Sequence, residues 1–280
     1  MTGGRFAPSP TGELHLGNLR TALAAHRSAR SHAIPFLVRM EDLDRVTSSI
    51  GHEQSQLADL AAVDVDHDGP VVRQSERFDL HLDALARLTD AGLTYECYCT
   101  RREIREATSA PHGPAPEGRY PGTCRDLTDG QRAVRAAARP PAIRLRSGHE
   151  VVTFTDAVAG MVTGIADDAV LRRNDGVPAY QLAVVVDDDD QGIDEVVRGD
   201  DLLGSTPTQI LIGRLLGLAT PRYAHVPLVV TTEGERLAKR HGAVTLRELA
   251  SRGIDAATVR DRLLASLERP GPMVFRPEEW

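Results

Sequence analysis

The sequence lacks several features that would place the protein in a specialised class. Its 280 residues contain no apolar run near the ~20 residues that a membrane span needs. The N-terminal residues lack the charged and then apolar order of a secretion signal, so we expect a soluble cytoplasmic protein. The formal net charge of -7 argues against a surface that coats nucleic acid, because such surfaces are usually basic.

Cysteine is also scarce. Cys97, Cys99 and Cys124 form an odd set in a chain without a secretion signal, which is a poor basis for a disulfide framework. Because all three fall within 28 residues, they are candidate zinc ligands, and zinc favours tetrahedral sites of sulfur and nitrogen. On chemistry alone, His112 would be the natural fourth ligand. The alternative is three reduced cysteines that bind no metal.

Strand-like and helix-like patterns alternate along the first ninety residues, which is typical of an α/β domain with a parallel sheet. Apolar residues recur with period two in residues 34–40, as in a strand, whereas Leu16, Leu19 and Leu23 have helical spacing. The run YQLAVVVDD (180–188) is predicted to be a buried strand that ends in acidic residues. The other predicted elements are strands at 4–7 and from Val71, helices at 52–62 and 205–218, a helix capped by Ser75 with Phe78, Leu82, Leu85 and Leu88 on its apolar side, and two short helices between Thr245 and Leu267.

The chain is predicted to contain one nucleotide-binding domain that a second unit interrupts. The proline- and glycine-rich loop SAPHGPAPEGRYPG and the strand-like run PPAIRLRSGHEVVTFTDAVAGMV break the strand–helix alternation, which returns at Ala179. We therefore expect a Rossmann-like parallel-sheet α/β domain, an inserted α+β subdomain that contains zinc, and a short helical C-terminal extension. The predicted boundaries are 1–93 and 178–244 for the two halves of the catalytic domain, 94–177 for the inserted subdomain and 245–280 for the extension.

The segment PSPTGELHLGNLRTAL (8–23) places a histidine and a glycine at the start of a predicted helix. Helix N-termini carry unpaired N–H groups and a partial positive charge, so phosphate groups bind there. Gly17 would let a base or a ribose approach the backbone, and His15 would donate to a phosphate oxygen that gains charge during a reaction. The alternative is that His15 caps the helix and the glycines serve turns.

Together these motifs resemble a known family, the class I aminoacyl-tRNA synthetases in their glutamyl form. The segment 8–23 is similar to the family's first signature. The motifs VRMEDLDR, QSERFD, YECYCTRREI, AVVVDD and VVRGDDLLGSTPTQILI follow in the family's order. GERLAKRHGA lies where the second signature, a lysine-containing loop, belongs. The resemblance covers roughly residues 4–245.

Two features resemble one branch of that family. Only forty residues follow Arg240, which we expect to be too few for the helical anticodon-binding region of translational members. Leu202 stands near the position where those members usually have a histidine. The chain therefore resembles the truncated branch that activates glutamate with ATP and attaches it to the queuosine base in the anticodon of tRNA(Asp).

This resemblance implies a set of site residues. His15 and Lys239 are the implied catalytic residues, and both would bind ATP together with Gly17 and Asn18. The implied side chains for L-glutamate are Arg5 and Arg198 at the side-chain carboxylate, Glu41 at the amino group, and Ser9 and Tyr180 alongside.

The chemistry of these residue types agrees with the implied roles. A guanidinium binds a carboxylate through two parallel hydrogen bonds, so the site would reject glutamine. The lysine loop, Arg236 to Arg240, lacks the family's usual serines. The ordinary alternatives are a solvated Lys239 and weak surface ion pairs, either Arg39 with Glu41 or Arg198 with Asp200.

The resemblance also concerns metal ions. It points to Tyr120, in the pattern Y-x-x-x-C before Cys124, as the fourth ligand in place of His112, so we predict one structural Zn²⁺ per chain. Mg²⁺ would arrive with ATP. The acidic run Asp187–Asp190 is interpreted as a strand end and a turn in preference to a magnesium site.

The predicted reaction is therefore the glutamylation of queuosine in tRNA(Asp) through glutamyl-adenylate. One alternative is a truncated glutamyl-tRNA synthetase that charges a tRNA 3′ end. Another is a non-catalytic paralogue that binds tRNA or a nucleotide. Arg101, Arg102 and Arg105 are expected either to contact the tRNA backbone or to form a solvated basic face.

Overall fold

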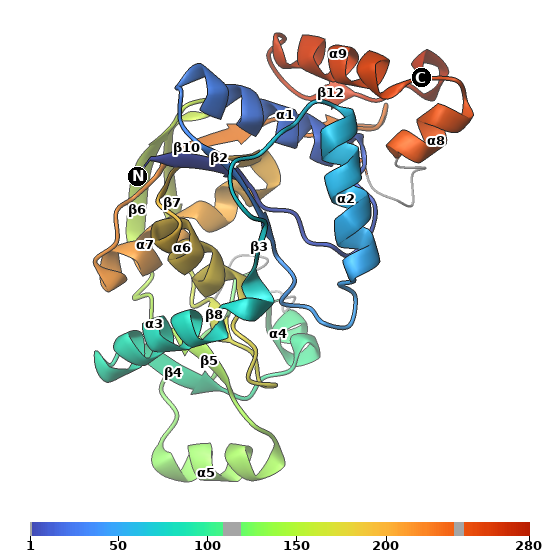
Figure 1. Ribbon diagram of the computed structural model, residues 1–280. Coiled ribbons are helices and arrows are strands. Elements are labelled where there is room, and N and C mark those ends of the chain that lie inside the picture. The colour runs from blue at the N-terminus through green and yellow to red at the C-terminus, as the bar shows by residue number, and fades with distance from the viewer. Residues whose placement is uncertain (1, 109–118, 238–243) are drawn as a thin grey trace.

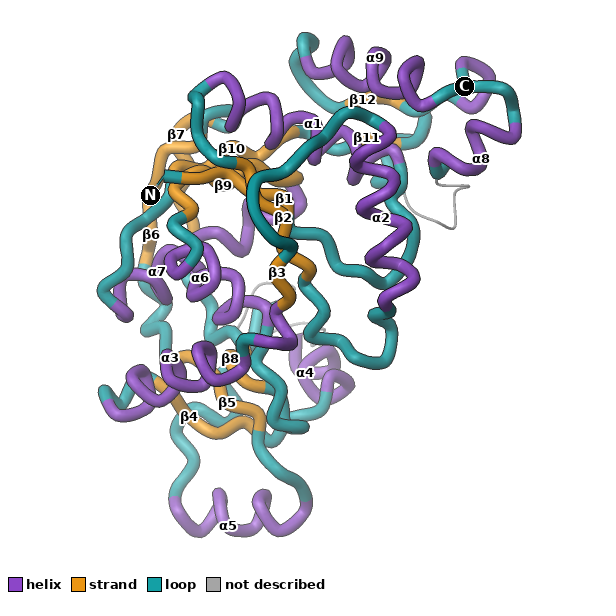
Figure 2. Tube along the Cα trace, viewed as in Figure 1, coloured by secondary structure: helices purple, strands orange, loops and turns teal. Residues whose placement is uncertain are grey.

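A seven-stranded sheet organises the described part of the protein, which in this computed structural model comprises residues 2–108, 119–237 and 244–280. The strand order is β3-β2-β1-β9-β10-β6-β7 (Figures 1 and 2). All neighbouring strands run parallel except β6 and β7. The strands are β1 (Gly3–Phe6), β2 (Phe36–Met40), β3 (Val72–Arg73), β6 (Val151–Asp156), β7 (Gly160–Ile165), β9 (Ile193–Gly199) and β10 (Arg222–Val226).

Helices cover both faces of the sheet. On β9, Val197 packs in a cluster with residues of α1 (Leu16–Ser31), whereas Val196 packs in a second cluster with residues of α3 (Phe78–Asp90), α6 (Tyr180–Asp190) and α7 (Thr206–Leu216). Successive side chains of a strand point to opposite faces, so the two clusters lie on opposite sides of the sheet. This arrangement confirms the expected Rossmann-like α/β fold. None of the described helices combines the length and apolar character that crossing a membrane requires.

The interrupting segment contributes to two sheets. Its strands β4 (Thr94–Cys97), β5 (Ala142–Leu145) and β8 (Val170–Arg172) form an antiparallel sheet beside α4 (Arg101–Thr108) and α5 (Asp129–Ala138), below the main sheet in Figure 1. Strands β6 and β7 instead extend the main sheet. A Cβ at Gly164 of β7 would lie 2.6 Å from Cγ of Pro207 in α7, so only glycine allows this close packing.

The C-terminal residues pack against the first helix. Helices α8 (Leu246–Ser251) and α9 (Ala256–Leu267) confirm the two predicted short helices, and α9 lies beside α1 (Figure 1). Strand β12 (Met273–Val274) pairs with β11 (Val229–Val230). The buried guanidinium of Arg20 in α1 donates to the carbonyl of Pro227 and to Ser266 of α9, which ties the extension to the loop after β10.

One predicted strand is wrong, because residues 180–190 form the helix α6. Leu182, Ala183, Val184 and Val186 are all buried between the sheet and neighbouring helices. An apolar run that is buried nearly all round has no helical stripe, so periodicity does not separate it from a buried strand. The strand of this region is β9, which begins after a turn at Gly192.

The start of α3 also differs from the prediction. Ser75 lies in a 3₁₀ turn (Gln74–Glu76), and its hydroxyl and N–H donate to Asp42 instead of capping the helix, which begins at Phe78. Leu82 was expected on the apolar face but is exposed. His81 takes a buried position in its place because it donates to Asp187 of α6 at 2.9 Å.

Candidate active site

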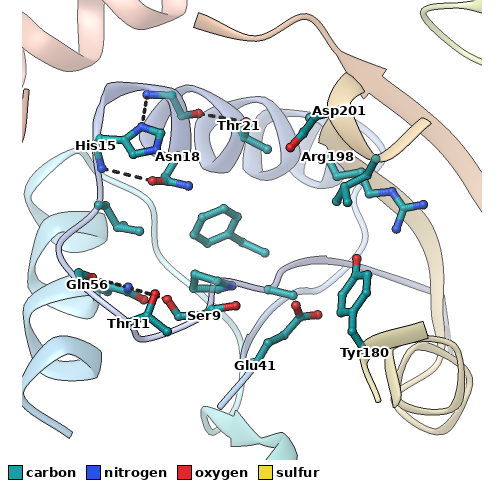
Figure 3. Close-up of a pocket in the computed structure, with 18 of the residues that line it drawn as sticks. Ser9, Thr11, His15, Asn18, Thr21, Glu41, Gln56, Tyr180, Arg198 and Asp201 are labelled. Carbon is teal, nitrogen blue, oxygen red and sulfur yellow. Dashed lines mark hydrogen bonds between the residues drawn. The ribbon is translucent and has the colours of Figure 1, made fainter. Parts of the chain in front are cut away.

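A cavity of about 670 Å³ opens at the carboxyl ends of the parallel strands β1, β2 and β9, next to the start of α1. Ligands bind at this edge in open α/β sheets, because the loops there are free to vary. The cavity contains every described residue that the sequence assigned to ATP or glutamate. Figure 3 shows His15 and Asn18 on one side and Glu41, Tyr180 and Arg198 on another.

The first side of the cavity is built by the N-terminus of α1. His15 is the N-cap, and its Nδ1 accepts from the N–H of Gly17 at 3.1 Å, while Oδ1 of Asn18 accepts from the N–H of His15 at 3.2 Å (Figure 3). His15 therefore both caps the helix and lines the cavity, so the two interpretations of this residue are compatible. A Cβ at Gly17 would lie 2.9 Å from Cε1 of His15, so glycine is needed here to accommodate the imidazole ring.

Two contacts fix the loop between β1 and α1. Gln56 of α2 (Ile50–Ala62) is buried, and its amide donates to the carbonyls of Ser9 and Gly12 at 3.0 and 2.7 Å (Figure 3). The N–H of Glu41 donates to the carbonyl of Pro8 at 2.9 Å, which couples the end of β2 to the same loop. The sequence analysis missed Gln56, and no local motif marks it.

The second side of the cavity carries buried positive charge. Arg198 of β9 donates from Nε to Nε2 of His225 at 3.1 Å and from Nη2 to Oγ1 of Thr206 at 2.8 Å. Arg5 of β1 donates to both carboxylate oxygens of Asp188, at 3.3 and 3.4 Å, and to the carbonyl of Val197. Both guanidinium groups are nearly buried, at 5% and 4% exposure, so each must be held by specific partners.

The acidic run lies at the end of the helix α6 instead of a strand, and its first two carboxylates contact basic side chains. Asp188 contacts Nη1 of Arg39 at 2.8 Å in addition to Arg5. Burial alone would raise the pKa of Asp188, but the two arginines hold this pKa below its usual value. Asp187 instead accepts hydrogen bonds from Gln74, Arg77 and His81. The run therefore neutralises buried cations beneath the cavity.

Glu41 has an unusual environment for a carboxylate. Burial raises its pKa to about 7, while the nearby Arg39 and Arg5 oppose this shift and Asp188 adds to it. Its Oε1 lies 3.7 Å from Nη2 of Arg39, whose side chain has no exposed surface. The expected weak surface ion pair is thus a buried one. Burial, followed by the charge of Glu41, also raises the pKa of the adjacent Tyr180.

The described residues that flank the centre of the lysine loop lie at the cavity on one side and beside its wall on the other. Leu237 and Arg236 line it, and Arg236 forms an ion pair with Asp201. After the loop, the carbonyl of Val244 accepts from the N–H of Leu16 at 3.2 Å, beside His15. Lys239 and Arg240, like His112, lie outside the described residues.

The three cysteines converge in the smaller unit. Their sulfur atoms all lie within 4.8 Å of one another, so they could hold a metal ion. The hydroxyl of Tyr120 lies 3.3 Å from Sγ of Cys97 and 3.5 Å from Sγ of Cys99, and it accepts from the N–H of Cys124 at 2.9 Å. A tetrahedral zinc with bonds of roughly 2.0–2.3 Å separates its ligand atoms by about 3.3–3.8 Å, which these spacings match.

The chain matches a family model described as tRNA synthetases class I (E and Q), catalytic domain, over residues 2–272. It is 58% identical to a Glutamyl-Q tRNA(Asp) synthetase of Nocardia farcinica, over 95% of this chain and 85% of that protein. It is 47% identical to the protein of the same name in Symbiobacterium thermophilum, over 100% and 91% of the two chains.

A solved structure is also similar. The crystal structure of a glutamate tRNA ligase from Elizabethkingia meningosepticum, in complex with its amino acid, superimposes with a TM-score of 0.78. That comparison covers 100% of this chain and 68% of the ligase, at 25% sequence identity.

Matched glycine substitutions test whether His15 needs the space at Gly17. Gly17 and Gly51 are each the second residue of a helix, but a Cβ at Gly51 would meet only Ser49 Oγ, at 4.0 Å. Gly51→Ala should raise the free energy of unfolding by about 0.4–1 kcal/mol. Gly17→Ala should make the same gain but also displace the ring and break its cap, so its free energy of unfolding should lie about 1 kcal/mol below that of Gly51→Ala. Urea denaturation of both variants measures the difference, and equal stabilisation would show that the ring does not occupy this position.

Proposed function

The chain belongs to the family of class I tRNA synthetases for glutamate and glutamine, and we propose that it activates L-glutamate with ATP and transfers it to the queuosine base in the anticodon of tRNA(Asp). The observation that carries the proposal is one cavity with a buried guanidinium and carboxylate at one end and a helix N-terminus at the other. The names of relatives that match 95% or more of the chain support the choice of tRNA(Asp) and queuosine.

The first step joins glutamate to AMP. An oxygen of the α-carboxylate attacks the α-phosphorus of ATP, the bond from that phosphorus to the bridging β-phosphate oxygen breaks, and pyrophosphate leaves with Mg²⁺. Such chemistry needs alignment and positive charge close to the departing oxygens. His15 and the partial positive charge at the N-terminus of α1 are well placed for the phosphates, since the helix begins at the cavity.

Glutamate is recognised at the other end. Two hydrogen bonds within the protein use two of the five N–H groups of Arg198, so the remaining ones face the side-chain carboxylate of the substrate. Arg5 adds positive charge near the same carboxylate, although its guanidinium already donates hydrogen bonds to Asp188. Ionised Glu41 accepts from the ammonium group, with Ser9 and Tyr180 alongside. Glutamine is rejected because its amide would present donors to a guanidinium that can only donate.

Lys239 completes the phosphate end of the proposed site. It is the only lysine among the 33 basic lysine and arginine residues of the chain. All other basic side chains in this count are arginines, so the one compact ammonium group lies in a loop that lines the cavity on one side and pairs with the start of α1 on the other. In this proposal Lys239 stabilises the departing pyrophosphate opposite His15.

The second step transfers the glutamyl group. A hydroxyl of the queuosine ring attacks the carbonyl carbon of glutamyl-adenylate, AMP leaves, and the hydroxyl proton is lost. The product is an ester on the modified base. In this proposal Arg101 and Arg102, which are exposed on α4, contact the tRNA backbone; the alternative is a solvated basic face. The side chain of Arg105 lies outside the described residues.

We also propose that Cys97, Cys99, Cys124 and Tyr120 bind one structural Zn²⁺. The distances among the four ligand atoms support this set. Hydrogen bonds from the other two thiols hold the pKa of Cys97 far below its usual value, which favours a thiolate in the cluster. When bound, the ion would cross-link the end of β4 to the chain beyond the proline-rich loop and so stabilise the smaller unit.

The transfer step predicts a strict requirement for queuosine. Labelled glutamate and ATP should label tRNA(Asp) from queuosine-producing cells and leave tRNA(Asp) without queuosine unlabelled. Exchange of pyrophosphate into ATP should require glutamate and fail with glutamine and aspartate. Equal labelling of the two tRNAs would favour charging of the 3′ end, and absence of any exchange would favour the non-catalytic alternative.

The raised pKa of Glu41 predicts pH-dependent glutamate binding. With a pKa of about 7 in the empty site, Glu41 is protonated at lower pH and loses the negative charge that attracts the ammonium group. The affinity for glutamate should therefore fall about tenfold per pH unit below 7, and binding at pH 6 should release a proton. Titration calorimetry in buffers of different ionisation enthalpy measures both quantities. Glu41→Gln should bind weakly with no such pH dependence, and a wild-type affinity that is constant from pH 6 to 8 would contradict the assignment.

The zinc proposal predicts metal content and the identity of the fourth ligand. Protein purified without chelator should contain one zinc per chain, and chelation should lower the unfolding temperature. Tyr120→Phe should lower zinc affinity by at least about tenfold, whereas His112→Ala should leave it unchanged. Elemental analysis and competition with a chromogenic chelator provide the readout. Metal-free protein, or loss of zinc in the His112 variant alone, would contradict the proposed ligand set.

A further inference from the structure

A buried carboxylate outside the cavity is connected to it through one histidine. Asp156 ends strand β6 and is 2% exposed. Its Oδ1 accepts from the N–H groups of Val158 and Ala159 at 2.9 and 2.8 Å. Its Oδ2 accepts from the N–H and from Nδ1 of His225, at 3.1 and 2.6 Å. All four contacts require Asp156 to be an acceptor.

The position of the proton on His225 is therefore fixed from both sides. Nδ1 must carry the proton, because it faces the carboxylate of Asp156. Nε2 must accept from Nε of Arg198 at 3.1 Å, because that group can only donate. Its other contact, Oγ1 of Thr206 at 3.0 Å, is a hydroxyl that can donate or accept and so fits this assignment. Burial lowers the pKa of His225 and so favours the neutral ring. The hydrogen bond to Asp156 raises this pKa and the charge of Arg198 lowers it, and the pKa remains below its usual value.

The neutral partner distinguishes Arg198 from the other arginines beneath the cavity. Arg5 and Arg39 are paired directly with Asp188. Among the residues that the structure describes, Arg198 contacts a neutral imidazole, the Thr206 hydroxyl and the face of the Tyr223 ring, with no direct ion pair. Its charge is thus held in place without being neutralised by a protein carboxylate.

We infer that Asp156 and His225 are positioning residues for Arg198, and that they make the end of the cavity selective for an anionic amino-acid side chain. The inference rests on the proposed function. Asp156 selects the Nδ1–H form of His225, His225 orients the guanidinium through Nε, and the other N–H groups of Arg198 then face the glutamate carboxylate. Strand β6 belongs to the interrupting segment but pairs with the main sheet. Through Asp156, this strand contributes to substrate recognition.

Asp156→Asn tests this chain of contacts with an isosteric change. If Oδ1 of the asparagine keeps the two turn N–H groups and the N–H of His225, which lies 3.2 Å from it, the NH₂ faces Nδ1 of His225, which must then move its proton to Nε2. Nε2–H would oppose Nε–H of Arg198, and the guanidinium would be displaced. The dissociation constant for glutamate should rise by at least about tenfold, with the KM for ATP changed by less than about twofold. A purely electrostatic effect has the opposite sign, because removing a negative charge would tighten glutamate binding.

Asp168→Asn is the matched control. Asp168 is equally buried and accepts from Tyr95, Arg125 and Ser147, but it lies in the smaller unit and does not line the cavity. This variant should lose stability without a change in glutamate affinity. Discrimination between glutamate and glutamine should fall in Asp156→Asn alone, because a merely structural loss would affect both variants alike.

Nitrogen-15 NMR of labelled histidine gives a readout that needs no catalysis. The wild-type protein should show His225 protonated at Nδ1, and Asp156→Asn should show it protonated at Nε2. Unchanged glutamate binding in a folded Asp156→Asn variant, or a wild-type His225 that is cationic or protonated at Nε2, overturns the inference. A wild-type protein that shows this tautomer but binds no glutamate would instead contradict the proposed function.

Discussion

The pairing of Asp188 with two buried arginines is the interaction on which the cavity depends. One carboxylate at the end of α6 contacts Arg5 at 3.3 Å and Arg39 at 2.8 Å, beneath the ends of β1 and β2. Leaving such charges buried and unpaired costs about 3–5 kcal/mol. Because Asp188 pairs with both arginines and Asp187 and Glu41 add negative charge beside Arg39, the site can hold a third guanidinium, Arg198, that is oriented by neutral groups and remains able to attract an anion.

The same architecture explains why the cavity has two chemically different ends. Parallel strands place Arg198 and Glu41 at one edge of the sheet, and the chain after β1 returns to that edge to begin α1. The N-terminus of the helix supplies partial positive charge without any burial of a charged side chain. An acidic amino acid and a nucleotide phosphate can therefore lie next to each other, as formation of an adenylate requires.

Motifs that are local in sequence were sufficient to predict part of this structure. The helix after residue 15 and the parallel α/β sheet followed from local patterns and spacing, whereas the grouping of Arg5, Glu41, Tyr180 and Arg198 was implied by the resemblance to the synthetase family. Contacts between distant segments were not predictable, because no pattern links Asp156 with His225 or Gln56 with Ser9. The error at residues 180–190 had a physical cause: a helix buried on several sides lacks the polar face that identifies it. It also concealed the role of Asp187 and Asp188.

A crystal structure with a non-hydrolysable analogue of glutamyl-adenylate tests the central claim most directly. The account predicts the side-chain carboxylate of the analogue within hydrogen-bonding distance of Arg198, its ammonium group at Glu41 and its phosphate at the N-terminus of α1 beside His15. An analogue bound in the reverse orientation, or one whose carboxylate is held by other residues while Arg198 contacts only protein, would contradict it.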